Sequence, residues 1–376
     1  MSAIDRDMNP GDSFQAEITL SRGSFSLSAA LEAPPGKTVG IIGPNGAGKS
    51  SLLKAIAGDI TIRSGSVRIG ERILSQAGER IRSQHLPRAQ RKLGYLDQRA
   101  RLFPHLSAQE NIAFGPRAAG VSRRHAFALA DQWLERVGLP GRGAARAHEL
   151  SGGQQQRVAI ARTLAAKPAA VLLDEPFAAL DASTAGSIRG LIAAELSRLQ
   201  IPALLVTHNA VDLLELAQEV CVLEHGRITQ QGPVHEILST PRTDFAARFS
   251  GRVLIRGSAS ARGTLQLARA PLPELRGVGD LPCPSGDAVA SFDPRDVRVS
   301  PQGDRQAEGS IQSWTDDVGE LTVTGSGVRV TGRNWTGSVA EVPLSRAHTF
   351  GLSPGQTLIF ELPPHAVSFA PGTEAR

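Results

Sequence analysis

The chain alternates short, uninterrupted apolar runs with segments whose apolar residues recur at helical spacing. Residues 38–42, 169–174 and 202–207 are apolar at nearly every position, which is typical of strands buried on both faces of a parallel sheet. A long segment with helical spacing, residues 183–200, separates the last two runs. This order predicts an α/β core built on a parallel sheet.

Two further patterns surround these runs. Between residue 14 and about residue 80, short apolar runs alternate with turn residues, which predicts a small antiparallel sheet beside the strand at 38–42. From about 100 to 168, three stretches show helical spacing, and each ends at Gly or Pro. We therefore expect the core to carry an antiparallel β subdomain and a helical subdomain.

The pattern changes near residue 240. Gly, Pro and Ser become frequent, and later runs such as AVASFDPRDVRV and QTLIFELPPHAVSF are β-like, which favours a separate all-β domain that forms a small barrel. The predicted organisation is a flexible extension over 1–13, an α/β domain over 14–240, a linker over 241–285 and a β-rich domain over 286–376.

Composition narrows the class of protein. The 376 residues are 41% hydrophobic and 20% charged, as in soluble globular proteins, and no stretch approaches the ~20 apolar residues of a membrane span. The polar, acidic N-terminus lacks the pattern of a secretory signal, so we expect no export. The two cysteines, Cys221 and Cys283, lie in a strand-like run and in a proline-rich stretch, where we expect neither a disulfide nor a metal site.

The formal net charge of +5 raises the question of nucleic-acid binding. Arginine is scattered along the whole chain, and a basic cluster such as residues 80–92 contains no interleaved aromatic residues. Aromatic residues are only 4% of the sequence, so platforms for base stacking are missing. We expect no nucleic-acid partner and interpret the basic charge as a solvated or membrane-proximal face.

A glycine-rich loop, GPNGAGKS at residues 43–50, lies between the strand at 38–42 and a helical pattern. Glycines let successive backbone N–H groups point at one anion, and the helix that follows adds the partial positive charge of its N-terminus. The pattern G-x-x-x-x-G-K-[ST] in this context predicts a phosphate-binding loop, with Lys49 on the β- and γ-phosphates and Ser50 on Mg²⁺. The alternative is a glycine-rich turn with an exposed lysine. The candidate residues are Gly43, Pro44, Asn45, Gly46, Ala47, Gly48, Lys49, Ser50 and Ser51.

A second stretch, LSGGQ at residues 150–154, is also suited to a phosphate. Ser151 occupies the N-cap position of a predicted helix, and two glycines follow it. Two phosphate sites in one domain make sense if each serves the nucleotide held by a neighbouring copy of the chain. The candidates are Ser151, Gly152, Gly153 and Gln154.

Polar side chains follow the predicted parallel strands. Asp174 and Glu175 end one strand, where Asp174 suits the water shell of Mg²⁺ and Glu175 suits the polarisation of an attacking water. His208 follows the next strand, and Asp181 lies just beyond the first. Gln98 could touch metal or water from the helical insert. All are expected at the carboxyl edge of the sheet, although Gln98 can also be an ordinary exposed residue and His208 a structural one.

These motifs, in this order, resemble those of the ATP-binding-cassette (ABC) ATPases. The resemblance covers residues 14 to about 235, with Walker A at 43–50, the Q-loop glutamine Gln98, the signature at 150–154, Walker B at 171–174, the D-loop around Asp181 and the switch histidine His208. It implies an ABC-type P-loop ATPase fold, ATP and Mg²⁺ as cofactors, and a head-to-tail homodimer. It also implies Glu175 as the catalytic base and His208 as the γ-phosphate sensor. The aromatic residue that contacts adenine stays open between Phe14 and Phe25.

One cassette without a membrane span, followed by a β-rich extension, resembles the detached ATPase subunit of a bacterial importer. The resemblance implies permease subunits in the membrane, an extracytoplasmic solute-binding protein, and a place at the cytoplasmic face of the membrane. The segment at 101–115 resembles the surface that receives the permease. Its apolar residues can equally be core.

The whole chain looks most like the molybdate-importer ATPases. The stretches that carry this are LFPHLSAQENIAFGPR, TPRTDFAARFSGRVLIRG and AVASFDPRDVRVSP. The last 65 residues resemble the oligobinding (OB-like, TOBE/Mop) β-barrel of such importers, but the short Ser- and Lys-bearing motif typical of oxyanion binding is not recognisable. The alternatives are an importer for sulfate, iron or another small solute, or a non-transport ABC ATPase.

Overall fold

The computed structural model describes residues 11–260, 263–268, 270–279, 281, 286–302 and 311–372. The chain divides into two units, Met1–Val234 and His235–Arg376, each with its own core. Most of the expected extension over 1–13, and Cys283, lie outside the described residues. No helix in the described part of the chain is long and apolar enough to cross a membrane.

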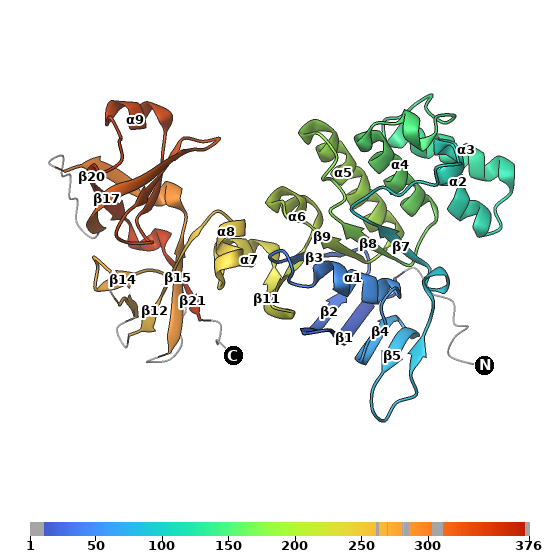
Figure 1. Ribbon diagram of the computed structural model, residues 1–376, viewed down its shortest axis with the longest axis horizontal. Coiled ribbons are helices and arrows are strands. Elements are labelled where there is room, and N and C mark those ends of the chain that lie inside the picture. The colour runs from blue at the N-terminus through green and yellow to red at the C-terminus, as the bar shows by residue number, and fades with distance from the viewer. Residues whose placement is uncertain are drawn as a thin grey trace. The chain divides into compact units, whose positions relative to one another are not determined.

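The first unit is built on one mixed sheet of eleven strands (Figure 1). Five strands at one end, in the order β10-β3-β9-β8-β7, pair in parallel. Every residue of β3, β8 and β9 is buried, as the continuous apolar runs predicted. The bounds are β3 (Thr38–Ile42), β7 (Leu93–Leu96), β8 (Ala170–Asp174), β9 (Ala203–Val206) and β10 (Glu219–Glu224).

The other end of the same sheet is largely antiparallel, in the order β6-β5-β4-β1-β2-β11. Strands β1 and β2 alternate buried and exposed residues, which fits a sheet with one face on the core. The predicted antiparallel strands are therefore confirmed, but they belong to the same sheet as the parallel strands and do not form a separate small sheet. The bounds are β1 (Phe14–Arg22), β2 (Phe25–Ala33), β4 (Ser64–Ile69), β5 (Arg72–Ala77), β6 (Gln84–His85) and β11 (Arg227–Pro233).

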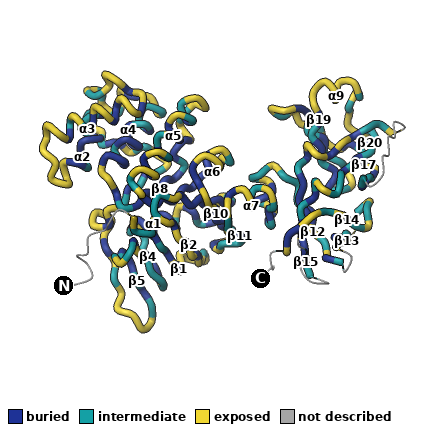
Figure 2. The backbone as a smooth tube through the Cα atoms, turned by 180° about the vertical axis from the view of Figure 1, so that it is seen from behind, coloured by how far each residue is buried: buried dark blue, intermediate teal, exposed yellow. Residues whose placement is uncertain are grey.

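Three helices form the predicted helical part, which gathers beyond β7 (Figure 1). Serine caps begin all three: Ser107 before α2, Ser122 before α3 and Ser151 before α4. Each of these helices has buried residues on one face and exposed residues on the outer face (Figure 2). The helices of the unit are α1 (Lys49–Ala57), α2 (Ala108–Ala118), α3 (Arg123–Arg136), α4 (Gly152–Ala165), α5 (Ala182–Leu199) and α6 (Ala210–Leu216), and α7 (Val234–Ser239) begins at the division.

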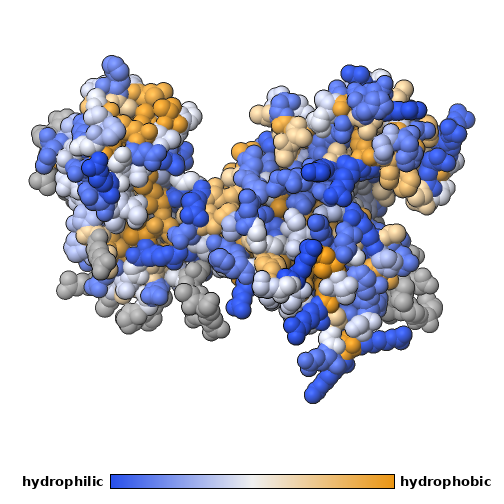
Figure 3. Space-filling view, in the orientation of Figure 1, coloured by the Kyte–Doolittle hydropathy of each residue, from blue (hydrophilic) through white to orange (hydrophobic). Residues whose placement is uncertain are grey.

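In its described residues, the second unit is all-β apart from most of α7, two further short helices, α8 (Asp244–Phe249) and α9 (Leu344–Thr349), and single turns of 3-10 helix. Its two sheets have the strand orders β14-β13-β12-β15-β21 and β16-β20-β17-β18-β19 and share one core. Trp314 is central to that core, because its ring stacks on Phe360 and its indole N–H donates to the Ser338 hydroxyl at 2.9 Å. This architecture is consistent with the expected oligobinding-type barrel. Hydrophobic surface gathers around α9, where Leu344 is exposed (Figure 3).

The expectation of a linker over 241–285 was wrong for much of that segment. It contains α8 and the strands β12 (Val253–Ala259), β13 (Thr264–Gln266) and β14 (Glu274–Arg276). Strand β12 pairs antiparallel with β15 (Asp287–Phe292) over six residue pairs, so partners distant in sequence define the strand. Gly, Pro and Ser in this segment separate short strands from one another, so their frequency does not indicate a connection without secondary structure. The remaining strands are β16 (Arg298–Pro301), β17 (Gln312–Val323), β18 (Val328–Gly332), β19 (Val339–Val342), β20 (Thr357–Leu362) and β21 (Ser368–Pro371).

A fully buried arginine holds the C-terminal end of α1 in place. Arg91 donates to the carbonyls of Ile56 and Leu86 at 2.7 Å each and to the Ser75 hydroxyl at 2.6 Å. Burial lowers the pKa of Arg91 to about 10. Because the last carbonyls of a helix lack partners and carry partial negative charge, this guanidinium both caps and stabilises α1.

We expect Arg91→Met to lower the free energy of unfolding by about 2–4 kcal/mol, because buried carbonyls of Ile56 and Leu86 lose their donors. Arg88→Met is the matched control, since Arg88 is exposed, forms an ion pair with Asp59 and lies 4.6 Å from the centre of the Tyr95 ring, contacts whose loss should cost about 1 kcal/mol. Urea unfolding followed by circular dichroism measures both. Equal destabilisation by the two substitutions would contradict the capping role of Arg91.

Candidate active site

The loop between β3 and α1 has a conformation that only glycine tolerates at several positions. Gly46 and Gly48 have φ values of 82° and 107°, and a Cβ on Gly43 would lie 2.0 Å from the Leu223 carbonyl oxygen. No side chain caps the N-terminus of α1, whose N-cap is Gly48. The first N–H groups of this helix are therefore free to bind an anion.

Lys49 is buried and folds back onto this loop. Its Nζ donates to the Gly43 carbonyl at 2.6 Å and to the Pro44 carbonyl at 3.0 Å. Burial lowers the pKa of Lys49, and the neighbouring carboxylates of Glu175 and Asp174 act in the opposite direction. The structure thus excludes the exposed lysine of the alternative interpretation.

Each carboxylate oxygen of Glu175 has a polar side chain beside it, and Gln98 donates a hydrogen bond to one of them. Gln98 Nε2 lies 3.0 Å from Oε2, and His208 Nε2 lies 3.0 Å from Oε1. Glu175 also has a positive φ of 49°, a strained conformation for this residue type that is common at functional sites. The three predicted catalytic residues therefore meet, although they are far apart in sequence.

The register of the parallel strands explains why they meet. Leu96 of β7 pairs with Leu173 of β8, and Asp174 pairs with Val206 of β9. Gln98, Glu175 and His208 follow these pairs by one or two residues, so their side chains leave the same edge of the sheet. This is the carboxyl edge, where ligands bind in open α/β sheets.

Asp174 is buried beside this group at the end of β8. Burial, together with the carboxylates of Glu175 and Asp97, raises the pKa of Asp174 to about 6. A buried carboxylate with this pKa is still largely ionised at neutral pH, and a bound cation would favour that form. Asp97 was not among the predicted site residues. Its position directly before Gln98 was the signal that could have found it.

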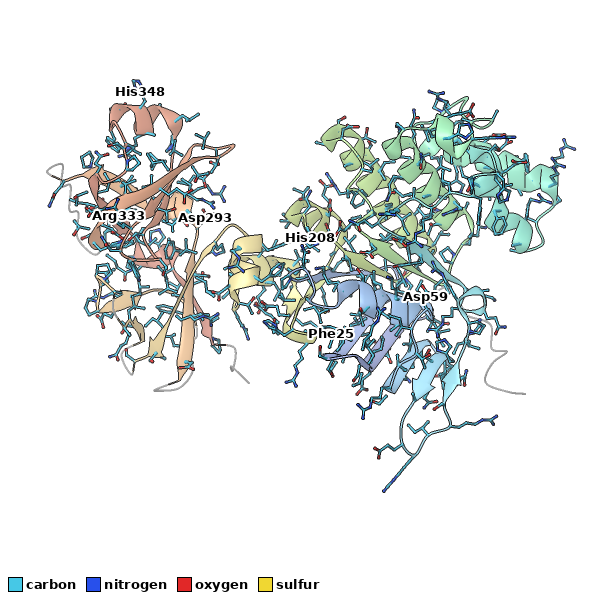
Figure 4. All side chains as sticks on the ribbon, in the orientation of Figure 1. Phe25, Asp59, His208, Asp293, Arg333 and His348 are labelled. Atoms are coloured by element: carbon cyan, nitrogen blue, oxygen red, sulfur yellow. The ribbon has the colours of Figure 1, made fainter. Side chains whose placement is uncertain are left out.

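One cavity of about 580 Å³ joins the loop to the carboxyl edge. Most of its lining was predicted from the sequence, whereas Arg22 and Val206 were missed, because nothing in their local sequence marks them. Phe25 and His208 in this lining, both labelled in Figure 4, come from strand β2 and from the loop after β9. The cavity is lined by Arg22, Phe25, Asn45, Gly46, Gly48, Lys49, Ser50, Ser51, Gln98, Asp174, Glu175, Val206 and His208.

The structure does not bring the signature residues into this cavity. Ser151 instead caps α4, with its hydroxyl accepting from the Gln154 N–H and the Gln154 side chain accepting from the Ser151 N–H. Gly152 and Gly153 are next to them at the start of the helix. Asp181 likewise caps α5, and hydrogen bonds from Thr184 and Ser183 lower its pKa.

The two candidate aromatic residues, Phe14 and Phe25, differ clearly in their surroundings. Phe14 is only 1% exposed and belongs to the core. Phe25 lines the cavity, and a Cβ on Gly48 would lie 2.7 Å from its ring, so this ring packs against the phosphate-loop candidate. Phe25 is therefore the aromatic residue that a nucleotide in this cavity can reach.

Comparisons with known proteins agree with the fold. A family model described as ABC transporter matches residues 28–178. The molybdenum import ATP-binding protein ModC of Mycobacterium tuberculosis is 36% identical over 357 residues, which cover 92% of this chain and 93% of the relative. The Fe(3+) ions import ATP-binding protein FbpC 2 of Rhodococcus jostii is 37% identical over 280 residues, covering 73% of this chain and 75% of the relative.

A solved structure provides a second comparison. It is an ATP-binding cassette in a dimeric, post-hydrolysis state bound to ADP and Pi, and it matches with 26% identity and a TM-score of 0.50. The match covers 59% of this chain and 98% of that chain. The chain therefore belongs to the ABC transporter family, as an importer-type ATPase that binds and hydrolyses ATP.

Proposed function

We propose that this chain is the ATP-hydrolysing subunit of a bacterial importer that takes up molybdate through a separate membrane permease. The observation that carries the hydrolytic part is the contact of Gln98 and His208 with the two oxygens of Glu175, in the cavity that also holds Lys49. The substrate part rests on similarity along nearly the whole chain, including the C-terminal unit.

The glycine-rich loop and Lys49 bind the phosphates of ATP. Backbone N–H groups at the start of α1 point at the anion, and Lys49 places its ammonium between the loop and the two carboxylates. Ser50, Asp174 and Gln98 line the same cavity and carry the oxygen donors that Mg²⁺ prefers. Mg²⁺, when bound, neutralises charge that develops on the transferred phosphoryl group.

Glu175 acts as the general base. Its oxygens each have a further lone pair after the contacts with Gln98 and His208, so the carboxylate can accept a proton from the attacking water. Gln98 orients this carboxylate and the water, and His208, beside the other carboxylate oxygen, senses the γ-phosphate. The carboxylate keeps its orientation because two neighbouring strands hold its partners.

The complete site requires two copies of the chain. Ser151, Gly152, Gly153 and Gln154 start a helix outside their own cavity, and Asp181 starts another. In a head-to-tail homodimer they complete the site of the partner copy, which fits the dimeric state described for the solved cassette. Each nucleotide then bridges two chains, so ATP binding shifts the population towards the closed dimer.

The remaining parts of the proposal follow from this arrangement. Phe25, in the lining of the cavity, stacks on adenine. The protein binds permease subunits at the cytoplasmic face of the membrane. On the other side of the membrane, these subunits receive substrate from an extracytoplasmic binding protein. The second unit is a TOBE-type domain. Support for this assembly comes from relatives that are named as import ATP-binding proteins.

Import of iron is the second candidate. Relatives named as Fe(3+) import proteins are as similar in identity, at 37%, but the alignments with those of Rhodococcus jostii and Rhizobium meliloti cover 73% and 64% of the chain. The alignment with the molybdenum import protein covers 92%. Agreement that extends over most of the second unit favours molybdate.

Glu175→Gln should reduce ATP turnover by about 10²–10⁴-fold, because an amide cannot accept the proton of the attacking water. ATP affinity should stay close to that of the wild type, since the loop and Lys49 are unchanged. Phosphate release and equilibrium ATP binding measure the two effects. The exposed Glu79→Gln is the matched control, and turnover equal to it would remove Glu175 from the role of base.

Lys49→Ala should weaken ATP binding about tenfold or more, because a charge-assisted contact of about 1.5–3 kcal/mol with the phosphates is lost. The control is Lys54→Ala, which removes an exposed lysine from the same helix α1. Calorimetric titration with ATP compares the two variants. Identical affinities would show that Lys49 does not bind phosphate.

Deletion of the gene in its native host should abolish uptake of labelled molybdate, and the wild-type gene, but not the Glu175→Gln form, should restore it. Excess tungstate should compete with molybdate, and moderate sulfate should not. Uptake of labelled Fe(3+) in the same strains tests the second candidate. Normal molybdate uptake after deletion, in a strain without another molybdate importer, would refute the proposed substrate and leave the ATPase assignment intact.

A further inference from the structure

Arg162 joins three segments of the helical part through one guanidinium group. It lies in the last turn of α4, the helix that begins with the signature residues. Its Nη2 donates to the Ala100 carbonyl at 3.2 Å, and its Nη1 donates to the Arg101 carbonyl at 3.1 Å. The same Nη1 reaches the Asn111 side-chain oxygen at 3.3 Å, and the guanidinium lies 5.1 Å from the centre of the Phe103 ring.

This cation is compensated without a carboxylate. Burial lowers the pKa of Arg162, and no acidic residue of the described part of the chain forms an ion pair with it. Two backbone carbonyls, one amide oxygen and one aromatic face replace the solvent that the guanidinium has lost. Only a planar donor can reach these acceptors together, so the site is specific for arginine rather than for positive charge.

The carbonyls that Arg162 holds belong to the loop that carries Gln98. This loop is closed by an ion pair of 3.0 Å between Asp97 and Arg101, and Arg101 has a positive φ of 40°. Such a strained backbone persists only when its surroundings hold it, and Arg162 holds the carbonyl of that same residue. The loop therefore presents Gln98 to Glu175 while its other end is fixed to α4.

Asn111 of α2, fully buried, extends the connection to the segment that follows. Its side-chain oxygen accepts from the Phe103 N–H at 2.9 Å, and its side-chain nitrogen donates to the carbonyls of Phe103, Leu106 and Ser107. The Phe103 ring also packs against the half-exposed Phe114 ring, with centroids 4.7 Å apart. Arg162 thus contacts both the Gln98 loop and the aromatic surface beside it.

We propose that Arg162 is a positioning residue that couples Gln98 to the signature helix α4 and to the Phe103 surface. Because one rigid guanidinium holds all three, Gln98 can leave or approach Glu175 only with a matching adjustment of α4 or of the Phe103 segment. The inference rests on the proposed function, since it assumes that Gln98 assists hydrolysis at Glu175. Arg162 acts through Gln98 and does not touch the reacting atoms.

The test is a double-mutant cycle in the full-length protein with Arg162→Lys and Gln98→Ala. Arg162→Lys keeps the charge but loses the planar pair of donors, and we expect kcat to fall about tenfold while ATP affinity changes less than about twofold. In the Gln98→Ala background the same substitution should cost less than about twofold in kcat. Additive losses would overturn the proposal, and so would an unchanged kcat in Arg162→Lys.

Arg157→Lys is the matched control for loss of folding. Arg157 lies on the same helix and donates from one nitrogen to the Val137 and Gly138 carbonyls at 3.1 and 3.0 Å, away from the Gln98 loop. It should lower the melting temperature about as much as Arg162→Lys and leave kcat within about twofold of the wild type. An equal loss of kcat in both variants would show that only general stability is involved, which would refute the positioning role.

Hydrogen exchange gives a readout that does not depend on turnover. Exchange of the Phe103 amide, which Asn111 protects, and of amides at the start of α4 should accelerate in Arg162→Lys and not in Arg157→Lys. Unchanged exchange at both places would contradict the coupling. If instead wild type and Glu175→Gln hydrolyse ATP at the same rate, the proposed function fails, while the exchange result still decides whether Arg162 holds the loop.

Discussion

The parallel register of β7, β8, β9 and β3 is the constraint on which the site depends. These four strands end at one edge, so the loops that follow them leave the sheet side by side. A shift by one residue in any pair would turn a buried strand residue towards the cavity and a site residue towards the other face. The complete burial of β3, β8 and β9, and the pairing of β7 with β8, therefore specify both the core and the relative positions of Gln98, Glu175 and His208.

Three buried or half-buried cations of the first unit form the same kind of contact. Lys49, Arg91 and Arg162 all donate to backbone carbonyl oxygens. Their contacts hold the phosphate-loop candidate, the C-terminal end of α1 and the Gln98 loop. Since carbonyls satisfy these donors without neutralising the charge, Lys49 keeps its positive charge in the lining of the cavity, which favours an anion there.

The candidate phosphate-binding residues and the signature residues lie at two different places in the first unit. The residues that bind phosphate in one chain lie at the carboxyl edge, whereas the signature residues begin a helix at another place in the same unit. A single copy thus holds only half of the proposed composite site. Under the proposed function, hydrolysis is conditional on association, and the contacts of Arg162 join the signature helix α4 to the Gln98 loop within each chain.

The sequence alone determined what local patterns can encode. The continuous apolar runs predicted the buried strands, and the glycine-rich loop and the ends of the strands predicted most of the cavity lining, because such motifs depend on neighbouring residues. Tertiary structure decided the rest: Phe25 rather than Phe14 faces the cavity, strands fill much of the expected linker, and Arg91 and Arg162 act through carbonyls that lie 35 and 61 residues away. Contacts of this kind arise only after the chain has packed, so no pattern of adjacent residues records them.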